Sequence, residues 1–207
     1  MFDEALQPIL GTSISANNVS KNFFKEIHEQ SRSIALIGMP GAGKSTIGKL
    51  LAKSLGWQFL DTDDKIRLQA GLCLQDILNQ SGYLYLRELE EKLLSKMQIR
   101  RRTVVATGGS IVYSQKAMRH IRKSTIIIYM RVPVPILLNR IDNLDNRGIA
   151  SQPDQTFEDM YTERNLLYQK YSDLCIDCGK SGVEKTVAEV SIQLCDYFRT
   201  DRSDDTR

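Results

Sequence analysis

One short segment constrains the fold of this 207-residue chain more than any other. It starts at Gly38, directly after the apolar run Ile34–Ile37, and reads Gly-Met-Pro-Gly-Ala-Gly-Lys-Ser. It therefore matches G-x-x-x-x-G-K-[ST] at every required position. Glycines let backbone N–H groups turn inward around phosphate oxygens, where a Cβ would block the approach. Apolar residues at helical spacing follow as far as Gly56. The sequence thus predicts a strand, a phosphate-binding loop and a helix, in that order.

The residue types in this loop indicate a nucleoside-triphosphate site. Lys44 is expected to place its charge near the β- and γ-phosphates, and the Ser45 hydroxyl is available to Mg²⁺. The N-terminus of the following helix adds a partial positive charge. An accidental glycine-rich turn is the alternative, and the flanking strand and helix argue against it. The expected ATP-binding residues of the loop are Gly41, Ala42, Gly43, Lys44, Ser45 and Thr46.

Between residues 33 and 198, short β-branched runs alternate with helical patterns. This order is typical of a three-layer α/β domain with a parallel sheet, and the length suits one domain. The apolar period fails from about residue 142 to 156, as in a lid or a disordered insert. Residues 1–32 are predicted to be a poorly ordered extension or one short helix, and residues 199–207 a frayed polar tail. The expected strands are Ser33–Ile37, Trp57–Asp61, Thr103–Thr107, Ser124–Met130 and Asp173–Asp177.

Composition excludes several other classes of function. The net charge of +3 is too mild and too evenly spread to favour nucleic acid as the main partner. The two histidines, His28 and His120, lie too far apart in sequence for a histidine-rich zinc site. Cys175 and Cys178 form a lone C-x-x-C that is better explained by an alternating strand. Without a long apolar segment or a basic leader, we expect a cytoplasmic protein with reduced thiols and no membrane partner.

Two carboxylates lie at the end of the second expected strand. Ligands of open α/β sheets bind at the carboxyl ends of the strands. We expect Asp61 and Asp63 to point to opposite sides until the chain turns into the next helix. One can then face the phosphates and a metal while the other faces the acceptor. Capping of the helix that follows is the alternative, and Thr62 is the better candidate for that role.

Two arginines complete the set of candidate site residues. The planar guanidinium groups of Arg87 and Arg164 suit a carboxylate or a phosphate equally well. Their spacing alone leaves ordinary surface pairing, such as Arg87 with Glu90, an equal alternative. After the third expected strand, Gly108 and Gly109 permit either a close approach to an acceptor or a simple tight turn.

In this order and spacing, the motifs of residues 33–198 resemble those of shikimate kinases, in the nucleoside monophosphate kinase fold group. The resemblance implies a three-layer P-loop kinase with a five-stranded parallel sheet and a lid. It also implies transfer of phosphate from ATP, with Mg²⁺, to the 3-hydroxyl of shikimate. Asp63 then binds the acceptor and takes its proton, whereas Ser45 and Asp61 lie beside Mg²⁺. Lys44 and Arg147 of the lid would act on the ATP phosphates.

The resemblance further implies that shikimate is bound by Asp63, Arg87, Gly108, Gly109 and Arg164, with Glu90 orienting Arg87. The chain departs from the family pattern at Gly148, where proline is usual, and at Ser110, where a third glycine is usual. Three alternatives therefore stay open: a kinase of another hydroxy acid such as gluconate, a nucleoside monophosphate kinase, and a non-catalytic kinase-like regulatory module. The expected partners are ATP and a small carboxylate-bearing polyol, and the expected state is a monomer.

Overall fold

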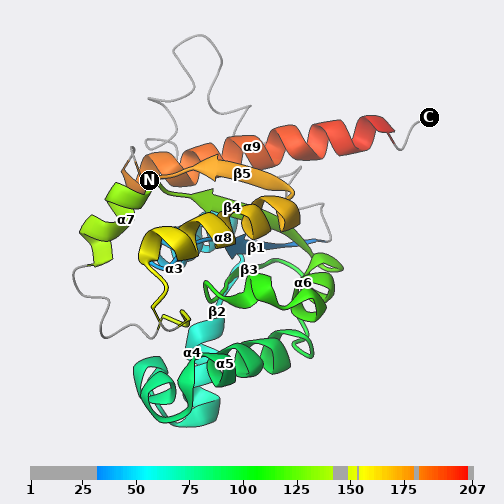
Figure 1. Ribbon diagram of the computed structural model, residues 1–207. Coiled ribbons are helices and arrows are strands. Elements are labelled where there is room, and N and C mark those ends of the chain that lie inside the picture. Colours follow the sequence, from blue (N-terminus) through cyan, green and yellow to red (C-terminus); the bar gives the residue numbers. More distant parts are fainter. Residues whose placement is uncertain (1–31, 142–148, 153, 180–181, 205–207) are drawn as a thin grey trace.

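A five-stranded parallel sheet forms the centre of the molecule (Figure 1). The computed structural model describes residues 32–141, 149–152, 154–179 and 182–204. The strand order is β2-β3-β1-β4-β5, which confirms the α/β class and the five parallel strands expected from the sequence. Each strand begins within one residue of its expected start. The bounds are β1 Ser33–Ile37, β2 Gln58–Asp61, β3 Thr103–Ala106, β4 Thr125–Arg131 and β5 Leu174–Asp177.

Helices cover both faces of this sheet. The connection from β1 to β2 runs one way across the sheet and all later connections run the other way. Because such crossovers are right-handed, the later helices lie on the opposite face. One face carries α3 (Lys44–Leu55) packed against α9 (Val183–Asp204). The other carries α5 (Leu74–Leu94), α6 (Gln115–Arg122) and α8 (Phe157–Tyr171). The remaining elements are α4 (Thr62–Ala70), η1 (Ile111–Tyr113) and α7 (Val134–Ile141).

The three central strands, β3, β1 and β4, are buried on both faces, which explains their continuous apolar runs. All five residues of β1 are buried, as are residues 125–130 of β4. Strands covered by helices on both sides need apolar residues at successive positions, not only at alternate ones. On α3, Ile47, Leu51 and Leu55 form the apolar stripe that packs onto the sheet.

A second, smaller apolar cluster lies under α4 and α5. It contains Ile66, Leu74, Ile77, Leu86 and Ala150. Helix α5 is interrupted at Gly82, whose φ of 78° and ψ of 173° are not helical. The part of α5 after Gly82 can therefore run in its own direction, and it carries Arg87 and Glu90. Helices α4 and α5 pack against each other and form a unit at one end of the molecule (Figure 1), and α5 also packs against α6.

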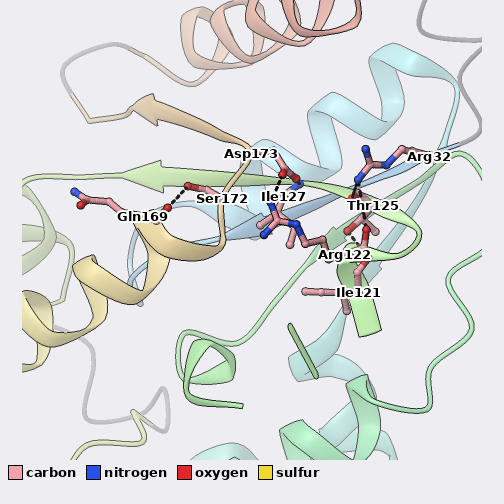
Figure 2. Close-up of polar contacts among 8 residues, drawn as sticks. All are labelled: Arg32, Ile121, Arg122, Thr125, Ile127, Gln169, Ser172 and Asp173. Atoms are coloured by element: carbon pink, nitrogen blue, oxygen red, sulfur yellow. Dashed lines mark hydrogen bonds and ion pairs between the residues drawn. The ribbon is translucent and has the colours of Figure 1, made fainter. Parts of the chain in front are cut away.

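Polar contacts bind the strands together at the amino end of the sheet (Figure 2). Asp173 accepts hydrogen bonds from the Ile127 backbone N–H at 2.9 Å and from the Arg122 guanidinium at 2.8 Å. Arg32 donates to the Thr125 carbonyl at 2.8 Å. These contacts link the start of β4 to the start of β5 and to the residue before β1. The carboxyl end of the sheet, where the cleft described below lies, is free of these contacts.

The C-terminal helix corrects one expectation. We expected a frayed tail from residue 199, but α9 continues through Asp204. Polar contacts one turn apart support this extension: Arg199 lies 3.7 Å from Asp196, and the Thr200 hydroxyl donates to the Tyr197 carbonyl at 2.9 Å. All four cysteines lie within the described residues, and none of them forms a disulfide there. Within the described ranges, no helix is both long and apolar enough to span a bilayer.

Candidate active site

A cleft of about 720 Å³ opens at the carboxyl ends of the central strands. The phosphate-binding loop forms one wall, and the unit of α4 and α5 contributes to the other. The structure brings together here nearly all the residues singled out in the sequence. The lining includes residues 40–46, Asp61, Asp63, Glu90, residues 107–110, Ala150 and Arg164. Arg147 lies outside the described residues, so its expected contact with ATP stays a prediction.

Lys44 points into the phosphate-binding loop. Its Nζ donates hydrogen bonds to the carbonyl oxygens of Gly38 at 2.7 Å and Met39 at 2.9 Å. Burial lowers the pKa of Lys44 to about 8, and the nearby carboxylates of Asp63 and Asp61 partly oppose this shift. The ammonium group is thus desolvated and close to its titration point at physiological pH. Phosphate oxygens at this place would supply the negative charge that its protonated form needs.

Because the pKa of Lys44 is lowered, we expect the protein to take up a proton when it binds the nucleotide. About one pH unit above the pKa of Lys44, most of the free protein has this side chain neutral, and a bound triphosphate restores its charge. Calorimetry of ATP binding in two buffers of different ionisation enthalpy should show more proton uptake there than at pH 7. Lys44→Met should lose the uptake, whereas Lys53→Met, on the exposed side of α3, should keep it. Equal proton uptake by the Lys44→Met variant would contradict this prediction.

Two oxygen atoms suited to Mg²⁺ lie side by side at the start of α3 and the end of β2. The Ser45 hydroxyl donates to Asp61 Oδ2 at 2.6 Å. The other oxygen, Oδ1, accepts from the Asp63 backbone N–H at 3.0 Å, so Asp61 also caps α4. Mg²⁺ is usually held by one or two protein oxygens together with phosphates and water. Hydroxyl and carboxylate at hydrogen-bond distance fit that pattern. The expectation that Thr62 would cap α4 was wrong, because Asp61 is the N-cap residue of this helix.

Asp63 lies in the first turn of α4, facing the cleft. Burial raises the pKa of Asp63, the charge of Asp61 raises it further, and Lys44 acts in the opposite direction. A carboxylate that is more basic than usual is better suited to accept a proton from a hydroxyl group. The expectation that the strand would send Asp61 and Asp63 to opposite sides was wrong. Residues two apart in a strand share a side, Asp63 belongs to α4, and both carboxylates line the same cleft.

The Thr107–Ser110 turn fits tightly against α4 and α5. Gly108 donates its backbone N–H to the buried Thr62 hydroxyl at 3.0 Å. A Cβ on Gly108 would overlap Glu90 Oε1 and lie 3.0 Å from Asp63 Oδ1. Only glycine therefore fits between these two carboxylates without displacing them.

Glu90 has a partner that the sequence did not indicate. The Ser110 hydroxyl donates a hydrogen bond to Glu90 Oε2. Burial raises the pKa of Glu90 to about 7, and this hydrogen bond opposes the shift. The guanidinium of Arg87 instead lies over an aromatic ring, with its Cζ 3.7 Å from the centroid of Tyr113. Ser110, which takes the place of a glycine in the family pattern, thus engages the carboxylate expected to orient Arg87.

The two arginines converge on one oxygen atom. Arg87 Nη2 lies 3.4 Å from the Ala150 carbonyl oxygen, and Arg164 Nη2 donates to the same atom. The Nε atoms of both arginines are buried without a hydrogen-bond partner among the described residues. Unpaired buried donors of this kind are costly unless a ligand supplies acceptors. Two guanidinium groups with donors to spare around a single oxygen position are suited to an anion with several oxygens.

Helix α8 holds Arg164 in place. Arg164 is only 1% exposed. One turn later, the Tyr168 hydroxyl donates to the Gly109 carbonyl at 2.6 Å, and its ring stacks on Tyr129 with centroids 5.0 Å apart. Next to Arg164, Asn165 accepts from the Tyr129 hydroxyl at 2.9 Å. These contacts fix α8 to both the sheet and the glycine turn.

Sequence reasoning missed four residues of the site. Thr62 and Tyr168 hold the glycine turn, Tyr113 stacks on Arg87, and Arg140 donates to the Gly41 carbonyl at 3.3 Å. Only Tyr168 carried a usable signal, because it lies one helical turn after Arg164 and so shares its face. The other three contacts join elements that are distant in sequence.

Comparison with known proteins gives one consistent family. The model of the shikimate kinase family matches residues 40–195. The shikimate kinase of Thermodesulfovibrio yellowstonii is 32% identical over 148 residues, covering 70% of this chain and 85% of the relative. That of Sulfurihydrogenibium is 31% identical over 163 residues, covering 79% of this chain and 98% of the relative.

Solved structures agree with this result. Shikimate kinase from Acinetobacter baumannii in complex with shikimate superposes with a TM-score of 0.73 at 29% identity, over 85% of this chain and 96% of the other. Shikimate kinase from Aquifex aeolicus gives a TM-score of 0.66 at 28% identity, over 78% and 95%.

Proposed function

The chain belongs to the shikimate kinase family, and from that premise we propose how its cleft transfers phosphate from ATP to the 3-hydroxyl of shikimate. It is an ATP-dependent kinase, so the alternative of a non-catalytic regulatory module is excluded. The observation that carries the acceptor assignment is the convergence of Arg87 and Arg164 on the Ala150 carbonyl oxygen. Shikimate has one carboxylate and three hydroxyl groups, so it presents both an anion and a nucleophile to this cleft.

The carboxylate of shikimate takes the place of the Ala150 carbonyl between the two arginines. It supplies acceptors for the unpaired Nε atoms of Arg87 and Arg164. Charge-assisted pairs of guanidinium and carboxylate are about twice as strong as neutral hydrogen bonds. Binding at this end orients the ring, while Gly108 and Gly109 leave room for it beside Asp63. The acceptor hydroxyl groups then face the phosphate-binding loop across the cleft.

Asp63 accepts the proton of the attacking hydroxyl. Its position at the start of α4 places the carboxylate between the glycine turn and Lys44, and its raised pKa favours proton uptake. The oxygen of the deprotonating hydroxyl forms the new bond to the γ-phosphorus, while the bond from that phosphorus to the β,γ-bridging oxygen breaks. ADP leaves with the electron pair of that bond.

The phosphate-binding loop positions the γ-phosphoryl group and neutralises its charge. Phosphoryl transfer is catalysed mainly by such positioning and charge neutralisation. The backbone of residues 41–46 surrounds the phosphates, and Lys44 exchanges its two carbonyl contacts for phosphate oxygens. Ser45 and Asp61 would hold Mg²⁺, which supplies further positive charge at the phosphates when bound. Arg147, in the proposed lid of about residues 142–156, adds its positive charge to that of Lys44 at the phosphates. We propose that the kinase unit as a whole spans residues 33–198.

A comparison of acceptors tests this function. With ATP and Mg²⁺, ADP release should be saturable with shikimate and at least about 100-fold less efficient with gluconate or AMP, because each lacks part of the match between carboxylate and hydroxyl positions. Removal of Mg²⁺ with a chelator should stop the reaction. Arg164→Met should lower kcat/KM for shikimate while leaving the affinity for ATP unchanged, with the exposed Arg101→Met as the control. Comparable efficiency with gluconate would contradict the assignment.

A further inference from the structure

Tyr113 is the aromatic residue that both acceptor-side arginines share. The Cζ of Arg87 lies 3.7 Å from the centroid of its ring, and the Cζ of Arg164 lies 5.4 Å from the same centroid. At the shorter distance the guanidinium is in direct contact with the face of the ring. Arg87 also lies 5.1 Å from the ring centroid of Tyr83, one turn earlier in α5. The Arg87 guanidinium thus lies within cation–π distance of two rings, one of which also reaches Arg164.

The ring of Tyr113 is itself held firmly. Tyr113 ends η1, whose other members Ile111 and Val112 are each 1% exposed and belong to the main core. Helix η1 packs against both α5 and α8, the two helices that carry the arginines. The Tyr113 hydroxyl is buried and makes no hydrogen bond to any described residue. The ring face is therefore the part of this side chain that interacts with the site, and the hydroxyl is not.

Among the described residues, no carboxylate forms an ion pair with Arg87. Glu90, the acidic residue one turn after Arg87 along α5, accepts its hydrogen bond from Ser110. Ring stacking differs from an ion pair in one respect that matters for binding an anion. A ring attracts the cation through its π face and leaves all the in-plane N–H donors free, whereas a carboxylate would occupy some of them. Stacking on Tyr113 thus fixes the plane of Arg87 without consuming its donors.

We propose that Tyr113 is a positioning residue that holds the Arg87 guanidinium ready for the carboxylate of the acceptor, and so favours carboxylate-bearing acceptors over neutral ones. This inference rests on the proposed function, and it adds a residue that touches neither ATP nor the reacting oxygen. A stacked, partly desolvated cation is attracted more strongly to its ring and also to an incoming anion. The benefit is specific to an anionic acceptor, since a neutral group gains little from a pre-placed guanidinium.

The test compares Tyr113→Leu and Tyr113→Phe with wild type, with shikimate and with its primary amide as acceptors. We expect Tyr113→Leu to raise KM for shikimate about 5- to 30-fold, the range of a desolvated cation–π contact of about 1–2 kcal/mol. We expect kcat and KM for ATP to change less than about twofold, and kcat/KM for the amide to stay nearly constant. Tyr113→Phe keeps the ring and should restore wild-type behaviour.

Two controls separate this role from a merely structural one. Tyr85→Leu makes the same substitution on α5 at a side chain that is 46% exposed, and it should leave every constant unchanged. Tyr113→Met is a second variant without a π face, and it keeps most of the side-chain volume. It should show the same rise in KM for shikimate, and it serves as the test if Tyr113→Leu folds poorly. The inference is overturned if KM for shikimate is unchanged in both, or if shikimate and the amide lose efficiency in parallel. Failure of wild type to phosphorylate shikimate would instead overturn the proposed function.

Discussion

Replacing Asp63 by asparagine should abolish phosphoryl transfer to shikimate while ATP still binds. An amide cannot take up the proton of the attacking hydroxyl, and loss of a positioned general base typically lowers rates by about 10²–10⁴-fold. The asparagine side chain keeps the size of the original one and its ability to hydrogen-bond a hydroxyl group. We therefore expect the loss in kcat, measured by ADP release, with KM for shikimate and the dissociation constant of ATP within about threefold of wild type.

The stability of this variant separates catalysis from folding. Burial raises the pKa of Asp63, so its ionised form is less favourable in the folded state than in the unfolded chain. A raised pKa removes stability as pH increases through the folded value, and asparagine escapes that loss because it carries no charge. Asp63→Asn should thus have a Tm at neutral pH no lower than that of wild type. Asp76→Asn, on the exposed first turn of α5, is the matched control. Near-normal turnover of Asp63→Asn would show that another group takes the proton.

Replacing Gly108 by alanine should produce the second large effect. The new Cβ would overlap Glu90 Oε1 and lie 3.0 Å from Asp63 Oδ1, so one or both carboxylates must move. A displacement of about 1 Å in such a group can lower a rate by about 10²-fold. We expect kcat/KM for shikimate to fall by about that factor, and unfolding to become easier by about 1–3 kcal/mol, as for other overpacked sites. Steady-state kinetics and denaturant titration would measure the two effects.

Gly182→Ala provides the control for this substitution. A Cβ there would come no closer than 3.8 Å to Glu184, which is ordinary van der Waals contact. Activity and stability should stay close to wild type. An active Gly108→Ala variant would mean that the turn can open without loss, and that the contact with the two carboxylates is not needed for transfer.

The sequence was most informative where the cause of a structure is local. Continuous apolar runs predicted the buried strands because helices cover both faces of the sheet. The glycine-rich segment predicted the phosphate-binding loop because its chemistry needs that spacing. In each case, the deciding residues lie within a few positions of one another.

Contacts between distant segments were not predictable in the same way. Ser110 engages Glu90, and Tyr113 stacks on Arg87, because η1 packs against α5, and no periodicity in either segment reports that packing. Asp61 caps α4 while also accepting from Ser45, since a carboxylate has two oxygens and both are used. Helix α9 runs past residue 198 in a stretch without apolar period, where polar contacts one turn apart accompany it as far as Thr200.

In the proposed binding mode, the Ala150 carbonyl acts as an internal substitute for the carboxylate of the acceptor. Because this oxygen already accepts from both Arg87 and Arg164, binding at this position is an exchange of one acceptor for another. The affinity of an acceptor therefore reflects the difference between two interaction free energies with these arginines, that of its head group and that of a peptide carbonyl. A neutral head group exchanges one neutral hydrogen-bond acceptor for another and gains little binding free energy. A carboxylate exchanges a neutral acceptor for a charged one, so its hydrogen bonds to the guanidinium groups are stronger. Inhibitors directed at this position should accordingly carry an anion, and a larger neutral ligand should not compensate for lacking one.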